Sequence, residues 1–408
     1  MSAPPTATAT ATAPGPLLVV MLGLVTAVGP LSLDMYLPAF PAVADDLGVP
    51  AAEVQLSLTT CLIGLALGQL VCGPLTDRWG RRRPMLVGVG AYAILSVLCA
   101  LAPSAPLLAA VRLLQGFAGG AGVVVARAVV RDLYAGVAAA KFFSRLTLIF
   151  GVAPIAAPSL GSAVLKVTSW HGIFVALGVI AALLTALLAW RIPETLPTDK
   201  RSPGSLRDIA RTARVLATDR AYAGYTLAQS FAFAALFAYI SGSSFVLQDG
   251  YGMSSTVYSI VFGVNACGLI VLSQANSRLL DRVAPRRLLL ATLAAQALAG
   301  GVVLAAATAG SLPGLIAGLF VLVGTIGMVT PNATALALDR HPERAGTAAA
   351  LMGGIQAVVA ALATPLVGFG DPGKGVPMGV AILACAVVAL LAVLLLTSRR
   401  RRQPEPLA

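Results

Sequence analysis

Residues 77–83 read Asp-Arg-Trp-Gly-Arg-Arg-Arg, and residues 281–287 read Asp-Arg-Val-Ala-Pro-Arg-Arg. The two stretches lie 204 residues apart, which is half of the 408-residue chain. Three further identities recur at the same spacing without a gap: Asp45 with Asp249, Gly48 with Gly252, and Gly64 with Gly268. The chain is therefore predicted to consist of two halves with the same internal order, each with a basic stretch in an equivalent loop.

The composition places both halves in a membrane. Hydrophobic residues make up 58% of the chain and charged residues only 11%, whereas soluble domains carry about 25% charged residues. So little polar surface cannot cover a water-soluble fold. A bilayer accepts apolar side chains, and helices satisfy their own backbone hydrogen bonds within it. The sequence thus predicts an all-α integral membrane protein.

Twelve stretches have the roughly 20 apolar residues that a helix needs to cross a bilayer. They are residues 17–40, 54–76, 84–103, 106–128, 143–165, 171–191, 221–245, 256–279, 287–309, 312–338, 346–369 and 376–397. Together with the repeat they predict two six-helix bundles in parallel repeat, related by an axis along the membrane normal. We expect a disordered cytoplasmic tail at 1–16, the N-terminal bundle at 17–191, a cytoplasmic linker at 192–220, the C-terminal bundle at 221–397 and a basic cytoplasmic tail at 398–408.

Basic residues mark one side of the membrane. The formal net charge of +12 is by itself compatible with nucleic-acid binding. On the side that follows the odd-numbered spans, however, only Lys166 and Lys374 are basic, and Arg112 lies inside a span; the other basic residues lie on the even side. This asymmetry predicts a multi-pass protein of the bacterial plasma membrane with both termini in the cytoplasm. The basic clusters then face lipid head groups, and no nucleic-acid partner is expected.

The sequence offers no enzyme site. The two histidines and five cysteines lack the spacing of metal ligands, and no cluster with a nucleophile stands out. We therefore expect a monomer that is not an enzyme and holds neither a metal nor a cofactor.

Two opposite charges fall inside the predicted spans. Asp34 lies in the outer third of the first span, and Arg112 lies in the outer half of the fourth. A charge at mid-bilayer costs about 2.5–3.5 kcal/mol on insertion scales, so it needs a partner, water or a proton. The repeat places Ala238 and Ile316 at the equivalent positions, so both charges are unique to the N-terminal half. The alternatives are a snorkelling Asp34 and a purely structural Arg112 bonded to helix carbonyls.

We expect Asp34 and Arg112 to face one central cavity and to interact directly or through water. Desolvation favours the protonated carboxyl group, whereas a nearby guanidinium favours the ionised one. A conformational change that alters water access or the distance to Arg112 would then load or release a proton at Asp34. A cationic or strongly polar substrate would displace this proton, and the membrane potential supplies about 2.3 kcal/mol per charge and 100 mV.

The basic loop of the N-terminal half has a further pattern, which we interpret as a conformational gate. Its residues are Gly73, Asp77, Arg78, Gly80, Arg81 and Arg82. Glycines allow a tight turn, and Asp77 is placed to meet the positive N-terminus of the helix at 346–369 or to pair with Arg127 or Arg131. Such a contact would hold the cytoplasmic side closed. Plain positive-inside anchoring, the alternative, accounts for the arginines but not for the aspartate and the glycines.

The fifth span carries Gly151, Pro154, Pro158 and Gly161. Prolines bend a helix, and small residues let another helix approach closely. The spacing predicts a bent helix at residues 143–165, although glycine and proline are common in membrane helices.

These motifs resemble those of a known family. The stretch from Gly73 to Arg82 resembles the loop motif of major facilitator proteins, and Arg112-Leu-Leu-Gln-Gly resembles their fourth-helix motif, which that family links to proton transfer. The series on the fifth span resembles the motif of antiporter-type exporters. Asp34-Met-Tyr-Leu-Pro-Ala, with Arg131-Asp132, looks like the Bcr/CflA group of bicyclomycin and chloramphenicol resistance proteins.

The resemblance covers the whole chain and is strongest over residues 30–195. It implies drug/proton antiport, with Asp34 and Arg112 as coupling residues, Asp77 as the gate acid, and Pro154 and Pro158 as the export-type bend. The chain departs from the pattern where Ala153 replaces the usual glycine and where Trp170-His171-Gly172 replaces an aromatic and arginine run. These departures leave the class intact and weaken any inference about substrate.

A drug cavity is mostly apolar with a few polar groups. Gln229, Phe233 and Phe237 have four-residue spacing and so share one helix face. We expect them to line the substrate cavity together with Asp34, Met35, Gln115, Tyr239, Asn265 and Gln356. Lipid contact or helix packing is the alternative for each.

The sequence therefore predicts a transporter that exports small amphipathic drugs, chloramphenicol-like or bicyclomycin-like, in exchange for protons. The proton gradient is its expected energy source. A proton-coupled uptake symporter for a small metabolite and a non-transporting membrane sensor are the alternatives.

Overall fold

The computed structural model describes residues 16–134, 136–198, 201, 214–216, 218–341, 345–368 and 372–397. These residues form helices and no strand. The tails expected at 1–16 and 398–408, apart from Pro16, and much of the linker expected at 192–220 lie outside the described residues. The boundaries of the two bundles stay predictions.

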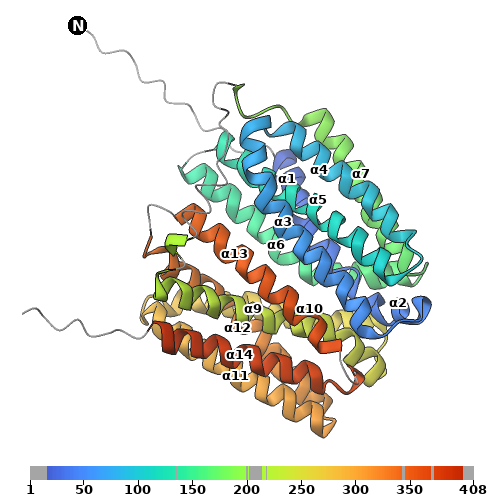
Figure 1. The fold of residues 1–408 in the computed structure, drawn as a ribbon, viewed down its shortest axis with the longest axis vertical. Helices are drawn as coiled ribbons and strands as arrows, with labels where there is room; N and C mark the ends of the chain where they lie inside the picture. The colour runs from blue at the N-terminus through green and yellow to red at the C-terminus, as the bar shows by residue number, and fades with distance from the viewer. Residues whose placement is uncertain are drawn as a thin grey trace, which may run out of the picture.

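The helices fall into two groups that follow each other along the chain (Figure 1). The N-terminal group consists of α1 (Pro16–Asp34), the 3₁₀ turn η1 (Leu37–Ala39), α2 (Phe40–Leu47), α3 (Ala51–Trp79), α4 (Arg82–Ala100), α5 (Ala105–Leu133), α6 (Gly136–Leu165) and α7 (Trp170–Arg191). The C-terminal group consists of α9 (Arg220–Ser244), the π-helical turn η3 (Phe245–Gly250), α10 (Ser255–Leu279), α11 (Pro285–Ala309), α12 (Leu312–Leu338), α13 (Ala345–Ala363), the 3₁₀ turns η5 (Pro365–Gly368) and η6 (Pro372–Lys374), and α14 (Val376–Leu396).

Most of the expected spans are confirmed as long apolar helices. Among the described residues, 11 helices are long and apolar enough to cross a membrane. The span expected at 143–165 lies in α6, of which only the shorter stretch Val152–Leu165 meets the apolar criterion. The all-helical architecture expected from the composition is thus present.

The two ends of the bundle differ in charge. We call the end that bears the turns after α3 and α10 the basic end, because Arg78, Arg81 and Arg83 lie there with Arg282 and Arg286 of the second half. We call the other end the distal end. It bears α2 and the turns that follow α4, α6 and α11.

The backbone conformation shows that the repeat in the sequence is also a repeat in the structure. Gly48 ends α2 with φ +62°, and Gly252 follows η3 with φ +67°. Both values lie in the left-handed region that glycine adopts without a steric penalty. Asp45 and Asp249 each precede their glycine by three residues at the end of a helical turn. The same turn therefore closes the distal end of both halves.

Glycines bring α3 and α5 into backbone contact. A Cβ atom added to Gly116 would overlap the carbonyl oxygen of Cys61, and one added to Gly64 would overlap the carbonyl oxygen of Leu113. Small residues four apart let membrane helices approach closely and gain dispersion energy. This close approach fixes the part of α5 that carries Arg112.

The two halves are joined at the distal end. Ser244 Oγ donates to the Leu37 carbonyl at 2.6 Å, and Gln248 Nε2 donates to the Pro38 carbonyl at 3.2 Å. Ser259 Oγ donates to the Pro158 carbonyl at 2.9 Å. Within the part of the chain that the structure describes, the hydrogen bonds that cross between the halves all lie at this end.

Replacing Gly116 with alanine tests the contact between α3 and α5. We expect Gly116→Ala to lower the melting temperature of the detergent-solubilised protein, because overpacking a close helix contact costs about 1–3 kcal/mol. Gly301→Ala is the matched control, since a Cβ atom at this helical glycine meets nothing within 4 Å. Equal melting temperatures for the two variants would contradict the backbone contact.

Candidate functional site

Arg112 is the most buried charge in the N-terminal half. Its residue is 0% exposed. One terminal nitrogen donates to Ser32 Oγ at 3.0 Å and to Gln115 Oε1 at 2.7 Å, and the other donates to the Ser32 carbonyl at 2.9 Å. The guanidinium carbon also lies 5.3 Å from the ring centre of Tyr36 and 5.5 Å from that of Phe174. The positive charge of Arg112 is thus stabilised by polar groups of α1 and α5 and by two aromatic rings. None of these partners is a carboxylate.

Gln115 belongs to the surroundings of Arg112. It is 0% exposed, and its Nε2 donates to Ser96 Oγ at 2.7 Å while Cys99 Sγ donates to its Oε1 at 3.7 Å. All of these partners lie inside the N-terminal half. Gln115 is therefore a packing and hydrogen-bonding residue in this conformation, and its expected place in the substrate cavity stays a prediction.

Asp34 lies on the opposite face of α1. It ends the helix and is 6% exposed, and the structure gives its carboxylate no hydrogen bond or ion pair with any described residue. Ser32 and Asp34 are two residues apart, which places them about 200° apart around a helix. Since Ser32 faces Arg112, Asp34 faces away from it. The expected direct pairing of Asp34 with Arg112 is therefore not formed in this conformation.

Asp34 instead faces the C-terminal half. Its carboxylate is close enough to Tyr239 on α9 and Tyr258 on α10 to interact electrostatically with both phenols. Tyr239 is 1% exposed, accepts a hydrogen bond from Asn265 Nδ2 at 3.1 Å and stacks on Phe262 at 5.6 Å. The expected grouping of Asp34, Tyr239 and Asn265 is thus present at the junction of the halves.

Tyr258 was not predicted from the sequence. It is 0% exposed, and its hydroxyl lies 3.3 Å from Ser243 Oγ. A tyrosine three residues into a membrane helix is equally typical of an interfacial residue that contacts head groups. Nothing in the spacing around residue 258 separates these two roles, so only the fold assigns it to the junction.

The other predicted cavity residues form a second group nearer the basic end. Gln229 Nε2 donates to Gln356 Oε1 at 2.7 Å, and Thr334 Oγ1 donates to Gln229 Oε1 at 2.8 Å. Phe233 and Phe237 lie with ring centres 4.9 Å apart. This group joins α9, α12 and α13, so the sequence correctly paired α9 with α13 but missed Thr334.

Pro158 and Gly161 of the helix-bend motif contact elements outside α6, Pro158 through the hydrogen bond that its carbonyl accepts from Ser259 on α10. The helix continues through Pro154 and Pro158 without interruption. A Cβ atom added to Gly161 would overlap the carbonyl oxygen of Met35, so this glycine allows α6 to approach the segment that follows Asp34. Met35 is 2% exposed. The surroundings of Gly151 lie outside the described residues.

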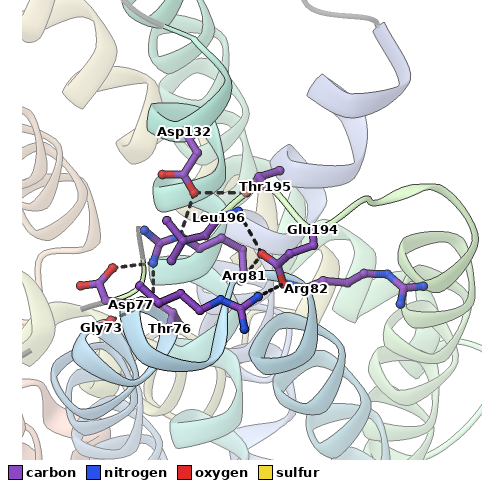
Figure 2. Close-up of polar contacts among 10 residues, drawn as sticks. Gly73, Thr76, Asp77, Arg81, Arg82, Asp132, Glu194, Thr195 and Leu196 are labelled. Carbon is purple, nitrogen blue, oxygen red and sulfur yellow. Dashed lines mark hydrogen bonds and ion pairs between the residues drawn. The ribbon is translucent and has the colours of Figure 1, made fainter. Parts of the chain in front are cut away.

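Arg81 is the centre of the gate motif (Figure 2). Its side chain donates to Asp77 at 2.6 Å, to Thr76 at 2.9 Å and to Asp132 at 2.8 Å. Burial opposes the charge of Arg81, but the hydrogen bonds to Asp132 and Asp77 outweigh it and raise its pKa above the ordinary value. Arg81 thus ties α3 to the end of α5.

The partner of Asp77 differs from the expectation. Asp77 is paired with Arg81 on its own segment, with 49% of its side chain exposed. The Asp77 carboxylate is half open to solvent whereas the Arg81 side chain is 7% exposed, so water can replace Arg81 as the partner of Asp77, while Arg81 depends on its acidic partners. Arg127 has an exposed side chain and Arg78 is also exposed. The side-chain surroundings of Arg131 and of residues 345–347 at the start of α13 are not described, so a contact of Asp77 with either stays a prediction.

Glu194 completes the gate motif and was missed by the sequence analysis. Its carboxylate accepts the backbone N–H of Arg81 at 2.7 Å, that of Arg82 at 3.3 Å and that of Leu196 at 3.0 Å. Burial opposes its ionisation, but these backbone hydrogen bonds outweigh burial and hold the pKa of Glu194 below its ordinary value. Figure 2 shows the carboxylate pointing at the turn between α3 and α4.

An acid also organises the basic end of the second half. Asp219 caps α9 by accepting the backbone N–H of Ala221 at 2.9 Å, and it binds Arg340 at 2.6 Å and His341 at 3.0 Å. Burial works against its charge, but the Arg340 hydrogen bond and the capping amides outweigh it and lower the pKa of Asp219. Arg340 and His341 follow α12, so Asp219 ties α9 to α12.

Comparisons with known proteins place the chain in a class of transporters. Residues 22–364 match the model of the Major Facilitator Superfamily. The chain is 42% identical over 383 residues to an uncharacterized MFS-type transporter, YdgK, of Bacillus subtilis, covering 93% of this chain and 95% of that protein. It belongs to the major facilitator superfamily and is a multi-pass transporter of the bacterial inner membrane.

Other relatives indicate which group of the superfamily the chain resembles. The chain is 36% identical to a bicyclomycin resistance protein homolog of Haemophilus influenzae, covering 93% of this chain and 96% of that protein. It is 33% identical to a chloramphenicol resistance protein of Pseudomonas aeruginosa over 63% of this chain and 59% of that protein. These similarities confirm the resemblance to the Bcr/CflA group of drug resistance proteins.

Solved structures share the fold. A bacterial homolog of the human lysosomal transporter Spinster superposes with a TM-score of 0.74 at 16% identity, covering 93% of this chain and 96% of that chain. The D-xylose–proton symporter superposes with a TM-score of 0.67 at 15% identity, over 91% of this chain and 97% of that chain. The predicted fold class is confirmed.

The cap at Asp219 predicts a pH-dependent stability. A group whose pKa is lowered by folding contributes stability above its unfolded pKa and loses it as the pH falls through the folded pKa. We expect Asp219→Asn to melt at a lower temperature than the wild type at pH 7, with the difference shrinking as the pH falls below the ordinary value of 3.8. Melting curves of both proteins in detergent between pH 3 and pH 7 measure this, and a pH-independent difference would contradict it.

The contacts of Arg112 predict that lysine is a poor substitute. A lysine ammonium cannot donate in the planar arrangement that serves Ser32 and Gln115 together. We expect Arg112→Lys to lower the melting temperature and to reduce transport at least tenfold, while Arg83→Lys, at an exposed arginine, leaves both unchanged. Wild-type transport by a well-folded Arg112→Lys protein would show that charge alone suffices.

Proposed function

We propose that the protein exports small amphipathic drugs in exchange for protons and that Asp34 carries the exchanged proton. The observation that supports this most directly is the placement of Asp34: a buried carboxylate at the junction of the two halves, with no hydrogen-bonding partner among the residues that the structure describes. An ionised carboxylate in such surroundings is costly, so the site favours a proton or a substrate group that neutralises the charge. The names of the drug-resistance relatives support the substrate class.

The proposed cycle uses the distal end as one of two gates. We assign the basic end to the cytoplasm, because basic residues accumulate on the cytoplasmic side of membrane proteins. With the halves joined at the distal end, Asp34 is shielded from the outside, and we propose that it exchanges drug and proton with the cytoplasm in this state. When the halves separate there, Asp34 is exposed to the outside, where it binds a proton as the drug leaves. The protein then acts as a monomeric transporter, not an enzyme, and draws its energy from the proton gradient.

Arg112 has an indirect role in this proposal. Its charge is satisfied by Ser32 on α1, two residues before Asp34. It therefore fixes the end of α1 and adds a positive potential behind Asp34 without forming an ion pair. We propose that the guanidinium keeps the proton on Asp34 exchangeable, since a nearby positive charge offsets part of the desolvation penalty.

The direct test is transport by everted membrane vesicles. We expect vesicles containing the wild type to accumulate radiolabelled chloramphenicol when a proton gradient, acidic inside, is imposed, and chloramphenicol to dissipate that gradient. Asp34→Asn should abolish gradient-driven accumulation because its side chain cannot release a proton. Asp45→Asn, at an exposed acid 11 residues further on, is the control and should transport normally.

Three outcomes would contradict the proposal. Drug movement out of everted vesicles along with protons would indicate an uptake symporter. Unchanged gradient-driven transport by Asp34→Asn would show that Asp34 does not carry the exchanged proton. Absence of transport of chloramphenicol, bicyclomycin and a panel of lipophilic drugs by the wild type would favour a sensor.

A further inference from the structure

The two halves share one interhelix contact at the basic end and differ in another. Arg82 donates from Nε to the Ile192 carbonyl at 2.9 Å and from a terminal nitrogen to the Ala189 carbonyl at 2.7 Å, at the end of α7. Its repeat counterpart, Arg286, donates to Thr397 Oγ1 at 3.4 Å, at the end of α14. An arginine that reaches the last helix of its half is therefore part of the shared architecture.

The residues that form the contacts of Glu194 and Arg81 have no equivalents in the sequence of the second half. The repeat spacing places Pro285 at the position of Arg81, Leu336 at that of Asp132 and Ser398 at that of Glu194. None of these three residues can form an ion pair. Because the fold is built twice and these residues occur once, the network is not a requirement of the shared architecture, and it is a candidate for a role in the conformational cycle.

Glu194 acts on Arg81 through the backbone. Arg81 and Arg82 stand at the start of α4, where the first N–H groups of a helix have no partner within the helix. The Glu194 carboxylate, which follows α7, accepts two of them and complements the helix dipole. It thus caps α4 from another helix, since α4 has no side-chain cap of its own.

The turn before the cap is shaped for this carboxylate. Gly80 has φ +86°, in the left-handed region, and a Cβ atom at this position would overlap Glu194 Oε2. Arg201 Nη2 lies 3.9 Å from the same oxygen. The Glu194 carboxylate is therefore held against residues 80–82. The next residue, Thr195, adds a link to the same network, because its Oγ1 donates to Asp132 at 3.1 Å.

We propose that Glu194 is a positioning residue for the gate: it holds the Arg81 backbone so that the guanidinium stays on Asp132 and offers its other face to Asp77. The proposal rests on the alternating-access cycle proposed above. Asp77 is the exchangeable partner, being half exposed, whereas Asp132 is 17% exposed in its side chain. With Arg81 fixed, Asp77 remains bound to it in the conformation that is joined at the distal end.

Loss of the cap therefore shifts the conformational equilibrium in a defined direction. When Arg81 is no longer held, Asp77 loses a preorganised partner and becomes available to the other half. The state with the basic ends apart is then less favoured. A purely structural cap would instead lower stability and leave the balance between the two states unchanged.

Distances between spin labels at the basic end test this. The exposed residues Arg83 and Arg278 are replaced by cysteine in a protein that lacks Cys267 and Cys385, and the labelled protein is measured in nanodiscs without drug or gradient. We expect Glu194→Gln to reduce the population with the long distance at least threefold. Glutamine keeps the shape of the side chain but replaces one carboxylate oxygen with an N–H₂ group, so at least one of the three backbone N–H donors loses its acceptor.

Asp219→Asn is the matched control, because Asp219 also caps a helix and binds an arginine at the basic end but contacts no gate residue. We expect it to lower the melting temperature as Glu194→Gln does and to leave the distance populations unchanged. An unchanged distribution in Glu194→Gln, or the same shift in both variants, would overturn the proposal.

A second variant covers the case in which Glu194→Gln does not fold. Glu194→Asp keeps the charge and withdraws the carboxylate by one methylene group, so we expect an intermediate shift of the populations in the same direction. No shift in Glu194→Asp would also overturn the proposal. Because the distances are measured without substrate or gradient, their result is independent of drug export: transport by the wild type can fail while the shift is observed, and the reverse.

Discussion

The interaction on which the N-terminal half depends is the hydrogen bonding of a guanidinium inside hydrocarbon. Arg112 is fully buried and satisfies its terminal nitrogens on Ser32 and Gln115. Hydrocarbon offers no water to complete these bonds, so α1 and α5 must keep their register for the charge to remain inside. The glycine contacts between α3 and α5 hold the same region at backbone distance. Asp34 stands at the edge of this rigid unit.

This arrangement separates the two intramembrane charges by function. Arg112 is enclosed by residues of its own half, and Asp34 faces residues of the other half. The terminal nitrogens of Arg112 are bonded within one half, so Arg112 is a source of positive potential that belongs to that half. Asp34 has no hydrogen-bonding partner among the described residues, and its neighbours Tyr239 and Tyr258 belong to the other half, so a movement of one half against the other changes its surroundings.

The fold could be predicted in nearly all its coarse features from the sequence. Apolar length and the repeat of Asp77-Arg78 at Asp281-Arg282 were sufficient for the helices, their order and the two halves. Single functional residues could also be predicted: an aspartate and an arginine inside apolar spans stand out because a charge in the bilayer has a high free-energy cost. The Gly64 and Gly116 contact had a readable signal as well, since each glycine is followed by another four residues later.

Contacts set by the rotation of a helix were not accessible. Asp34 and Arg112 were expected to pair because both lie at similar depth, but depth does not specify which face of α1 each approaches. The role of Glu194 has no signal in the sequence. An acidic residue after a membrane helix is common, and the partners of Glu194 are backbone amides, which have no sequence signature. Tyr258 and Thr334 were missed for the same reason, because their neighbours come from helices that only the packing brings together.

The two halves also differ in the contact between their second and fourth long helices, which are α3 and α5 in the first half and α10 and α12 in the second. Where the N-terminal half has Gly116 against the backbone of α3, the C-terminal half has Phe320, whose ring lies against Gly268 on α10 at 3.0 Å from an added Cβ atom. The α3/α5 seam has such a carbonyl contact at four glycines, Gly64, Gly68, Gly116 and Gly120, whereas on the α10/α12 seam the direct backbone contact is made by Gly327, against the Leu269 carbonyl. A side chain added at any of the four would push two backbones apart, so the N-terminal seam tolerates substitution at fewer positions than its counterpart in the second half.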